Sequence, residues 1–304
     1  MRPPARSLIT RRQLLVGGGA TAAALLVSAC GDDSVGTTAS SATTVPSDAG
    51  GSGSLALAQF FGGPIFVAGQ PLRAPFGVAD ADGLLSVDDT PRRLDVQLSG
   101  PDGTDLGDPI AVERRSEGLP RAYFPLLATL AEPGIYTART ELTGGPAEMS
   151  FQVYDAAEVK VIQPGAAMPA LETPTTTDAH GVNPICTRDP VCPLHDVTVA
   201  QALADATPMA LLVSTPAFCQ LAICGPVLEV LLQAASSHAG VKFLHSEVYA
   251  DPAKDLTTYA PAIAPLGLHF EPCLVLVDGT GKVVDRVDTI YDATELDERL
   301  GALA

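Results

Sequence analysis

The stretch that decides how this sequence is interpreted is residues 209–232, which read MALLVSTPAFCQLAICGPVLEVLL. Its first five residues are all apolar, as in a buried strand of a parallel sheet. Apolar residues then recur at helical spacing, so residues 219–236 are expected to be helical. Cys219 falls at the junction, where the positive end of a helix would stabilise a thiolate. The stretch therefore predicts a reactive cysteine between a strand and a helix.

Around this stretch, apolar strands and amphipathic helices alternate over residues 198–304. Thr198 and Gln201 form a capping-box pattern at the start of one helix, and Asp292 is placed to cap the last one. Further strands are expected at residues 241–245, 273–277 and 282–287, and a mostly polar helix near residues 253–259. The pattern predicts an α/β domain.

This order of elements resembles the thioredoxin fold, and the resemblance covers about one third of the chain. Residues 214–219, STPAFC, look like the family's motif in which an aromatic residue precedes the first redox cysteine. Glu271-Pro272, directly before a strand, looks like the family's cis-proline. Asp278-Gly279 sits where the family's last hairpin turns. An α/β thioredoxin-like domain is therefore expected at residues 198–304.

The resemblance implies a thiol–disulfide oxidoreductase that acts on the thiols or disulfides of exported proteins and needs no cofactor. Cys219 would be the nucleophile and Cys224 the resolving thiol. Pro272 would shape the edge at which a peptide docks. Cys273 follows the proline, and it either joins the two cysteines in one cluster or is a small buried strand residue.

The spacing of the cysteines departs from the family, because four residues separate Cys219 from Cys224 where thioredoxins have two. A disulfide needs Cα atoms within about 7 Å. Either Cys219 therefore lies in the loop before the helix, or the first helical turn is distorted. Gly225-Pro226 favours a regular helix that starts near Pro226, since proline suits a first turn. The alternative to a redox site is a purely structural disulfide.

Two other functions fit the same residues. Sco-type copper chaperones share this fold, with two cysteines near a helix start and a distal histidine. Copper would then bind Cys219, Cys224 and His269, although the cysteine spacing here is one residue longer than in that family. The third alternative is a non-catalytic surface lipoprotein whose disulfides only brace the domain.

Residues 157–197 form a proline-rich connector that contains Cys186 and Cys192. A disulfide closing this small loop is expected. The alternative is a soft metal held by the two cysteines and His195. Low-complexity sequence such as Thr173-Pro174-Thr175-Thr176-Thr177 predicts that residues 165–190 are open to proteolysis.

Residues 55–156 have the pattern of an all-β domain. Apolar and polar residues alternate in short runs, which turn signals such as Gly100-Pro101-Asp102-Gly103 separate. Pro133-Gly134-Ile135-Tyr136 resembles the entry to a late strand of immunoglobulin-like domains, where a tyrosine pins a corner. The region contains no cysteine or histidine. We therefore expect an immunoglobulin-like β-sandwich that acts as a spacer or binds a partner.

The first 30 residues predict export and a lipid anchor. Residues 1–29 combine a basic start, the pair Arg11-Arg12 and a short apolar run, as in a twin-arginine signal peptide. Val27-Ser28-Ala29-Cys30 resembles the lipobox of bacterial lipoproteins, in which the cysteine is lipidated and becomes the mature N-terminus. Residues 30–54 are small and polar and would form a flexible tether. The protein is expected at the extracytoplasmic face of the cell membrane.

The charge and the cysteine content limit the kinds of partner that the protein is expected to bind. The chain has 18 basic and 35 acidic residues, a net charge of −17, and loss of the four signal arginines leaves 14 against 35, or −21. Such acidity argues against binding nucleic acid or anionic lipid headgroups. Disulfides persist outside the cytoplasm. Lipidation of Cys30 leaves five cysteines, so at least one is free or bonded to another chain.

Overall fold

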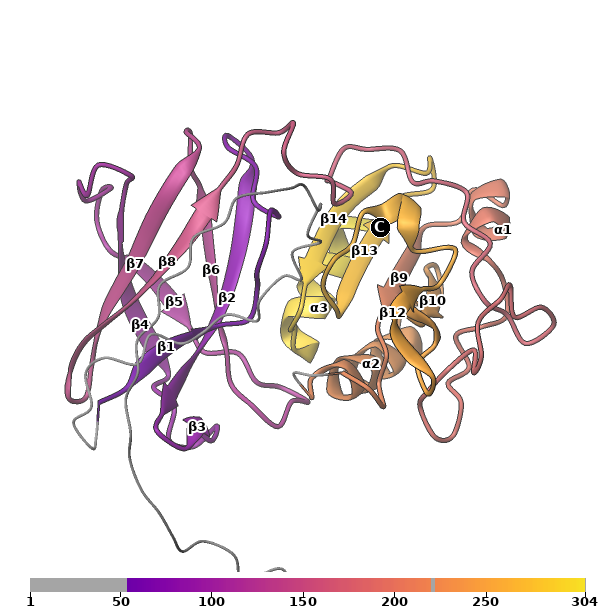
Figure 1. Cartoon of the computed structure of the whole chain (residues 1–304), viewed down its shortest axis with the longest axis horizontal. Coiled ribbons are helices and arrows are strands. Elements are labelled where there is room, and N and C mark those ends of the chain that lie inside the picture. The colour runs from indigo at the N-terminus through magenta and orange to yellow at the C-terminus, as the bar shows by residue number, and fades with distance from the viewer. Residues whose placement is uncertain (1–53, 220–221, 304) are drawn as a thin grey trace, which may run out of the picture. The chain divides into compact units, whose positions relative to one another are not determined.

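Strands dominate the computed structural model, which describes residues 54–219 and 222–303 (Figure 1). Residues 1–53, which hold the expected signal peptide, the lipidated Cys30 and the tether, lie outside this description. The N-terminal strands are β1 (Ala56–Gln59), β2 (Pro71–Asp80), β3 (Gly83–Leu84), β4 (Arg93–Ser99), β5 (Ile110–Glu113), β6 (Phe124–Thr129), β7 (Gly134–Leu142) and β8 (Gly145–Val153). They pair antiparallel in two sheets, one in the order β1-β2-β3 with β6 also on β2, the other in the order β5-β4-β7-β8.

Side chains of the two N-terminal sheets lie in one buried cluster, which also includes side chains of the C-terminal strands at residues 209–213 and 273–277. Every second residue is buried along β7 and β8, for example Tyr136 and Ala138 on β7 and Met149 and Phe151 on β8. This alternation fixes the register, because a slip of one residue would turn these side chains to solvent. The Tyr136 hydroxyl donates a hydrogen bond of 2.8 Å to the Glu132 carbonyl just before β7. The arrangement is compatible with the β-sandwich expected for residues 55–156.

The later strands form a separate sheet of four in the order β10-β9-β13-β14. Its strands are β9 (Met209–Val213), β10 (Lys242–Ser246), β13 (Cys273–Val277) and β14 (Val283–Asp288). The helices are α1 (Val199–Ala204), α2 (Cys224–Ala235) and α3 (Ala293–Leu300), with short 3-10 turns at Ala264–Leu266 and Gly301–Leu303. Strand β9 runs parallel to β10 and antiparallel to β13. Every residue of β9 and β13 is buried, which accounts for their uninterrupted apolar sequences.

Two segments expected to be helical differ in the structure. Residues 253–259 lie in a hairpin of β11 (Tyr249–Asp251) and β12 (Asp255–Tyr259). The rings of Tyr249 and Tyr259 stack across it with centroids 5.8 Å apart, and such cross-strand aromatic pairs stabilise hairpins. Helix α2 begins at Cys224 rather than at residue 219, because Ala222 has a φ of 53°, which a right-handed helix cannot accommodate.

The segment expected to be an exposed connector, residues 157–197, packs against the rest of the chain. All of its residues are described and none is in a helix or strand, yet several of its apolar side chains are buried: Val161, Met168, Leu171, Val182 and Leu194. The structure does not support the expectation that residues 165–190 are a soft linker. A protease would have to pull these side chains out of the core before it could bind the backbone.

The backbone of the same segment covers both edges of the four-stranded sheet. At the β14 edge, the Val283 N–H donates to the Ala166 carbonyl over 2.9 Å and the Met168 N–H donates to the Gly281 carbonyl over 2.8 Å. At the β10 edge, the His245 N–H donates to the Leu194 carbonyl over 3.0 Å. These bonds satisfy backbone groups that an edge strand would otherwise leave open.

A buried ion pair connects β2 to α3. Arg73 Nε lies 2.7 Å from Glu295 Oε1 and Arg73 Nη2 lies 2.7 Å from Oε2, with side chains 7% and 4% exposed. The Tyr123 hydroxyl donates to the same carboxylate over 2.5 Å, and Arg299 Nη2 donates over 2.8 Å. Burial alone would raise the pKa of Glu295, but the charge and hydrogen bonds of Arg73 lower it to about 2.

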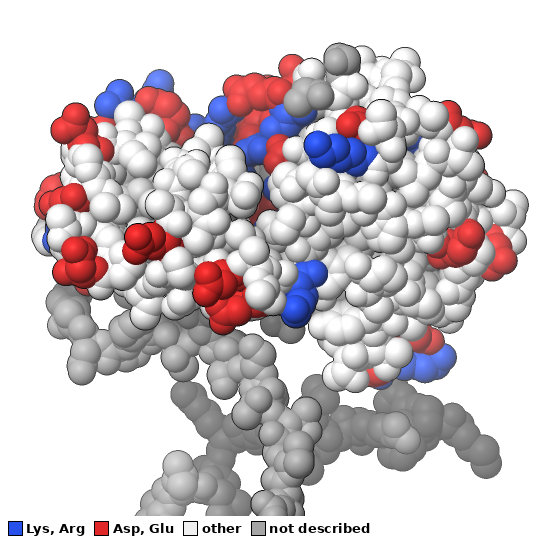
Figure 2. Space-filling view, turned by 90° about the horizontal axis from the view of Figure 1, so that it is seen from above, with Lys and Arg blue, Asp and Glu red and all other residues white. Residues whose placement is uncertain are grey.

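The surface reflects the acidic composition. On the face drawn in Figure 2, Asp and Glu side chains form several separate groups, and the Lys and Arg side chains are fewer and lie mostly beside them. The described residues on this face form no continuous basic patch. Among the residues that the structure describes, no helix is long and apolar enough to span a membrane.

Candidate redox site and a cysteine–histidine cluster

Cys219 and Cys224 form a disulfide with a Cα–Cα distance of 5.9 Å. Cys219 lies in the loop that follows the turn at residues 216–218, and Cys224 is the first residue of α2. The sequence left two possibilities, a Cys219 in the loop before the helix or a distorted first helical turn. The structure has Cys219 in the loop. Cys219 is half-buried, whereas Cys224 is fully buried. Of the two cysteines, Cys219 is therefore the one that keeps solvent-accessible surface.

A pocket of about 270 Å³ opens at Cys219. Its other walls come from the β11–β12 hairpin and from the loop before β13: Val248, Tyr249, Tyr259, His269, Phe270 and Glu271. Phe218 beside the cysteine is 38% exposed and Tyr259 is 48% exposed. A small pocket with aromatic walls and an exposed rim suits a side chain of a protein partner better than a large cofactor.

Glu271 contacts the buried side of the disulfide. Its Oε2 accepts a hydrogen bond of 2.6 Å from the Thr215 N–H and lies 3.6 Å from Cys224 Sγ. Burial raises the pKa of Glu271 above the usual value of a glutamate. A carboxyl group with a raised pKa at this position can exchange a proton with a Cys224 thiol. The Glu271–Pro272 peptide bond is cis, which is the geometry expected from the sequence.

Cys273 is a fully buried residue of β13, and it follows Pro272 directly. Its thiol donates to Asp288 Oδ1 over 3.8 Å. Burial raises its pKa well above the usual value, which disfavours the reactive thiolate. Of the two possibilities considered for Cys273, these contacts favour a buried strand residue over a member of the redox cluster.

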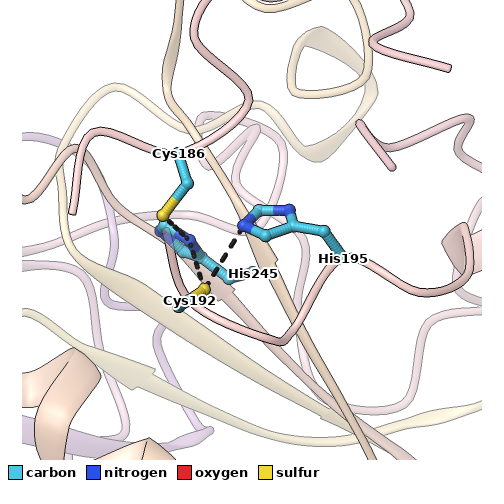
Figure 3. Close-up of side chains that lie close together, drawn as sticks. All are labelled: Cys186, Cys192, His195 and His245. Atoms are coloured by element: carbon cyan, nitrogen blue, oxygen red, sulfur yellow. Dashed lines mark hydrogen bonds between the residues drawn. The ribbon is translucent and has the colours of Figure 1, made fainter. Parts of the chain in front are cut away.

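The disulfide expected between Cys186 and Cys192 is not formed in the structure, where both are buried free cysteines. Their thiols instead turn toward the imidazoles of His195 and His245 (Figure 3). Cys192 Sγ lies 3.3 Å from His195 Nε2 and 3.5 Å from His245 Nδ1. A hydrogen bond from the Cys192 thiol lowers the pKa of Cys186. The expectation rested on spacing alone, which does not reveal where the sulfurs point.

The alternative copper ligands Cys219, Cys224 and His269 are not assembled as a ligand group. The two sulfurs are bonded to each other and so are not thiolate ligands, and His269 Nε2 lies 3.3 Å from the Gly62 carbonyl oxygen. Cys219 and His269 do line the same pocket. Over the described residues, the group whose atoms lie close enough to share a metal is the one around His245.

His245 is the residue of this cluster that sequence reasoning missed. It is the fourth residue of β10, between Leu244 and Ser246, in a strand whose last four residues are buried. A histidine in the buried part of a strand needs polar partners, because a buried imidazole without them is costly. The buried position of His245 could have indicated a site, but it does not identify the side chains that His245 contacts.

No protein-family model matches the sequence, and no curated protein matches it. Two solved structures show limited similarity. A superoxide reductase (neelaredoxin) from Ignicoccus hospitalis is 15% identical over 33% of this chain and 79% of that chain, with a TM-score of 0.23. The PKD domain from the human VPS10 domain-containing receptor SorCS2 is 18% identical over 42% of this chain and 97% of that chain, with a TM-score of 0.18. At TM-scores this low, neither similarity supports an assignment of fold or function.

Proposed function

We propose that this chain is a lipid-anchored, extracytoplasmic thiol–disulfide oxidoreductase that acts on exported proteins through Cys219 and Cys224. The observation that carries the proposal is the disulfide between a half-buried loop cysteine and the buried first residue of α2, beside the cis Glu271–Pro272 bond. Thiol exchange requires a cysteine that a partner can reach, and Cys219 is half-buried and lines a pocket, whereas a disulfide that only braces the fold has no such need.

The sheet order supports a thioredoxin-like domain at residues 198–304. A parallel pair joined through a helix, β9-α2-β10, precedes an antiparallel hairpin, β13-β14, and a closing helix, α3. This is the order of elements on which the resemblance to the thioredoxin fold rests. The hydrogen bond from Tyr136 to the Glu132 carbonyl likewise supports an immunoglobulin-like sandwich at residues 55–156.

In the oxidising direction, a substrate thiolate attacks the Cys219 sulfur and forms a mixed disulfide. The bond between Cys219 and Cys224 breaks, and its electron pair leaves on Cys224. This thiolate forms at the N-terminus of α2, where the helix dipole stabilises negative charge. The Glu271 carboxyl group then donates a proton to the Cys224 thiolate. A second substrate thiolate attacks the substrate sulfur, releases Cys219 as a thiolate and leaves as the oxidised product. Reduction of a substrate follows the same steps in reverse.

Single serine variants test the proposal. Reduced Cys224→Ser protein mixed with a disulfide-bonded peptide should accumulate a mixed disulfide through Cys219, since no resolving thiol remains. Cys219→Ser should accumulate none. Non-reducing electrophoresis with mass spectrometry of the linked peptide measures both.

Cys273→Ser serves as the matched control and should exchange thiols as the unmodified chain does. Absence of any mixed disulfide with Cys224→Ser would contradict the oxidoreductase proposal. The copper alternative predicts a different pattern, in which both serine variants at 219 and 224 lose Cu(I) binding and neither traps a peptide.

The location is a proposal that rests on the sequence of residues 1–30. The mature protein should begin at a lipidated Cys30 and fractionate with membranes, because two acyl chains on one cysteine anchor a protein stably. Mass spectrometry of the mature N-terminus identifies the modification, and Cys30→Ala should shift the protein to the soluble fraction. An unmodified mature N-terminus, or equal fractionation of variant and parent, would argue against the anchor.

A further inference from the structure

Four buried side chains that take no part in the proposed thiol exchange meet near the end of β10. Cys186, Cys192 and His195 come from the segment at residues 157–197, and His245 comes from β10 (Figure 3). Their exposed fractions are 3%, 2%, 0% and 1% in that order. The four possible ligand atoms all lie within 4.8 Å of one another. Burying four such polar side chains costs free energy unless they bind a ligand between them.

We propose that these four residues bind one Zn²⁺ ion in a closed tetrahedral site. Zn–S bonds of about 2.3 Å and Zn–N bonds of about 2.0–2.1 Å separate neighbouring ligand atoms of a tetrahedron by about 3.3–3.8 Å. Cys192 Sγ lies 3.3 Å from His195 Nε2 and 3.5 Å from His245 Nδ1, and Cys186 Sγ lies 3.6 Å from His245 Nδ1. These three separations match three of the six edges of a zinc tetrahedron, and all four atoms lie within 4.8 Å of one another.

The second nitrogen of each imidazole is held by a backbone carbonyl. His195 Nδ1 lies 3.3 Å from the Pro174 carbonyl oxygen, and His245 Nε2 lies 3.1 Å from that of Ser214. Each of these nitrogens is thereby placed to carry the ring proton. The lone pairs of His195 Nε2 and His245 Nδ1 are then directed at the two sulfurs. Outer contacts of this kind orient histidines that ligate metals.

Charge and softness of the ligands favour zinc. Two cysteine thiolates neutralise a divalent cation, so the loaded site buries no net charge. Oxygen-preferring cations such as Mg²⁺ and Ca²⁺ find no carboxylate in this set of ligands. Two sulfurs with two nitrogens in a tetrahedron are characteristic of zinc or of an iron–sulfur centre, and ligand atoms this close together suit a single ion. Because all four positions are filled by buried side chains, the site leaves no room for a substrate and is structural.

The ion would fasten the segment at residues 186–195 to the sheet. Thr187 follows Cys186, its N–H donates to Glu247 over 2.6 Å, and its Oγ1 accepts from the Ala217 N–H over 3.2 Å. Ala217 belongs to the loop that leads to Cys219. The zinc site therefore supports that loop, although the zinc proposal itself does not depend on any activity of Cys219.

Metal titration of the full-length protein tests the proposal. The protein is reduced, freed of metal with a chelator and titrated with ZnCl₂ in competition with a chromogenic zinc indicator. We expect one equivalent of Zn²⁺ per chain and a higher melting temperature on loading. Cys192→Ser and His245→Ala should each weaken binding by at least about 100-fold. Co²⁺ in the same site should show the intense bands of a four-coordinate ion and thiolate charge transfer.

Two controls separate this site from the redox site. The double variant Cys219→Ser/Cys224→Ser and the variant His269→Ala should both retain one equivalent of zinc, whatever their effect on thiol exchange. The Co²⁺ spectrum of the Cys219→Ser/Cys224→Ser chain leaves all four proposed ligands in place and removes the redox thiols, so it decides the matter even if His245→Ala fails to fold. The proposal is overturned if the reduced chain binds no zinc, if it binds only Cu(I), if Co²⁺ shows no thiolate band, or if unreduced protein always contains a Cys186–Cys192 disulfide.

Discussion

Replacing Glu295 by glutamine is expected to lower the free energy of unfolding by about 3–5 kcal/mol, because it leaves the Arg73 guanidinium buried without its counter-charge. The carboxylate receives two hydrogen bonds of 2.7 Å from Arg73, and both side chains are almost fully buried, so solvent screens the pair very little. Tyr123 would also lose the charged acceptor of its hydroxyl. Unfolding by urea, followed by circular dichroism, measures the change.

Glu298→Gln is the matched control on the same helix. Glu298 pairs with Arg115 at 2.8 Å but is 57% exposed, so this change should cost about 0–1 kcal/mol. The pH dependence supplies a second check. The pKa of Glu295 is about 2 in the folded chain, below the value of about 4.3 expected when unfolded. The pair therefore stabilises the fold above pH 4.3 and loses this effect as the pH falls toward 2. Glu295→Gln should lack that part of the acid dependence; equal midpoints for all three proteins would refute the role of the pair.

After reduction, Cys219 should react with iodoacetamide at least about 100-fold faster than Cys273 at pH 7, since each unit of raised pKa removes about tenfold of the thiolate. Cys219 is half-buried at the mouth of a pocket, whereas Cys273 is fully buried and its pKa is raised well above the usual value. Cys224, buried at the start of α2, should react at an intermediate rate. Timed alkylation with peptide mass spectrometry gives the rates.

The same chain unfolded in urea is the control for this difference. All of its cysteines should then react at similar rates, because neither burial nor the helix dipole acts on them. If Cys273 reacts as fast as Cys219 in the folded protein, the disulfide site has no kinetic preference for Cys219, and the assignment of the nucleophile is wrong.

The buried strands of the C-terminal half could be predicted because burial on both faces leaves a direct trace in the sequence. Residues 209–213 and 273–277 are uninterrupted apolar runs, and both are strands. The sequence of the β11–β12 hairpin contains no comparable apolar run. Its second strand is mostly exposed and polar, and what stabilises it is the stacking of Tyr249 on Tyr259, a contact that depends on the turn between them.

The candidate site was predictable where its residues are close in sequence. Cys219 and Cys224 are five residues apart, so a loop and a helix start suffice to join them. His245 lies 50 residues beyond His195, and the pairing of β10 with the 157–197 segment, through the hydrogen bond from the His245 N–H to the Leu194 carbonyl, brings it to the other ligands. Neither spacing nor composition specifies that pairing. The same limit explains why Cys186 and Cys192 were expected to bond to each other.

The coverage of both sheet edges by residues 157–197 has a consequence for dissecting the protein. A chain cut at the start of α1 would lose the Ala166 and Leu194 carbonyls, and β14 and β10 would each present unpaired backbone groups. Open edges of this kind act as templates on which further copies add strand by strand, which leads to aggregation. We therefore expect a monomeric fragment of the C-terminal half to require a start upstream of Ala166, well before the first helix.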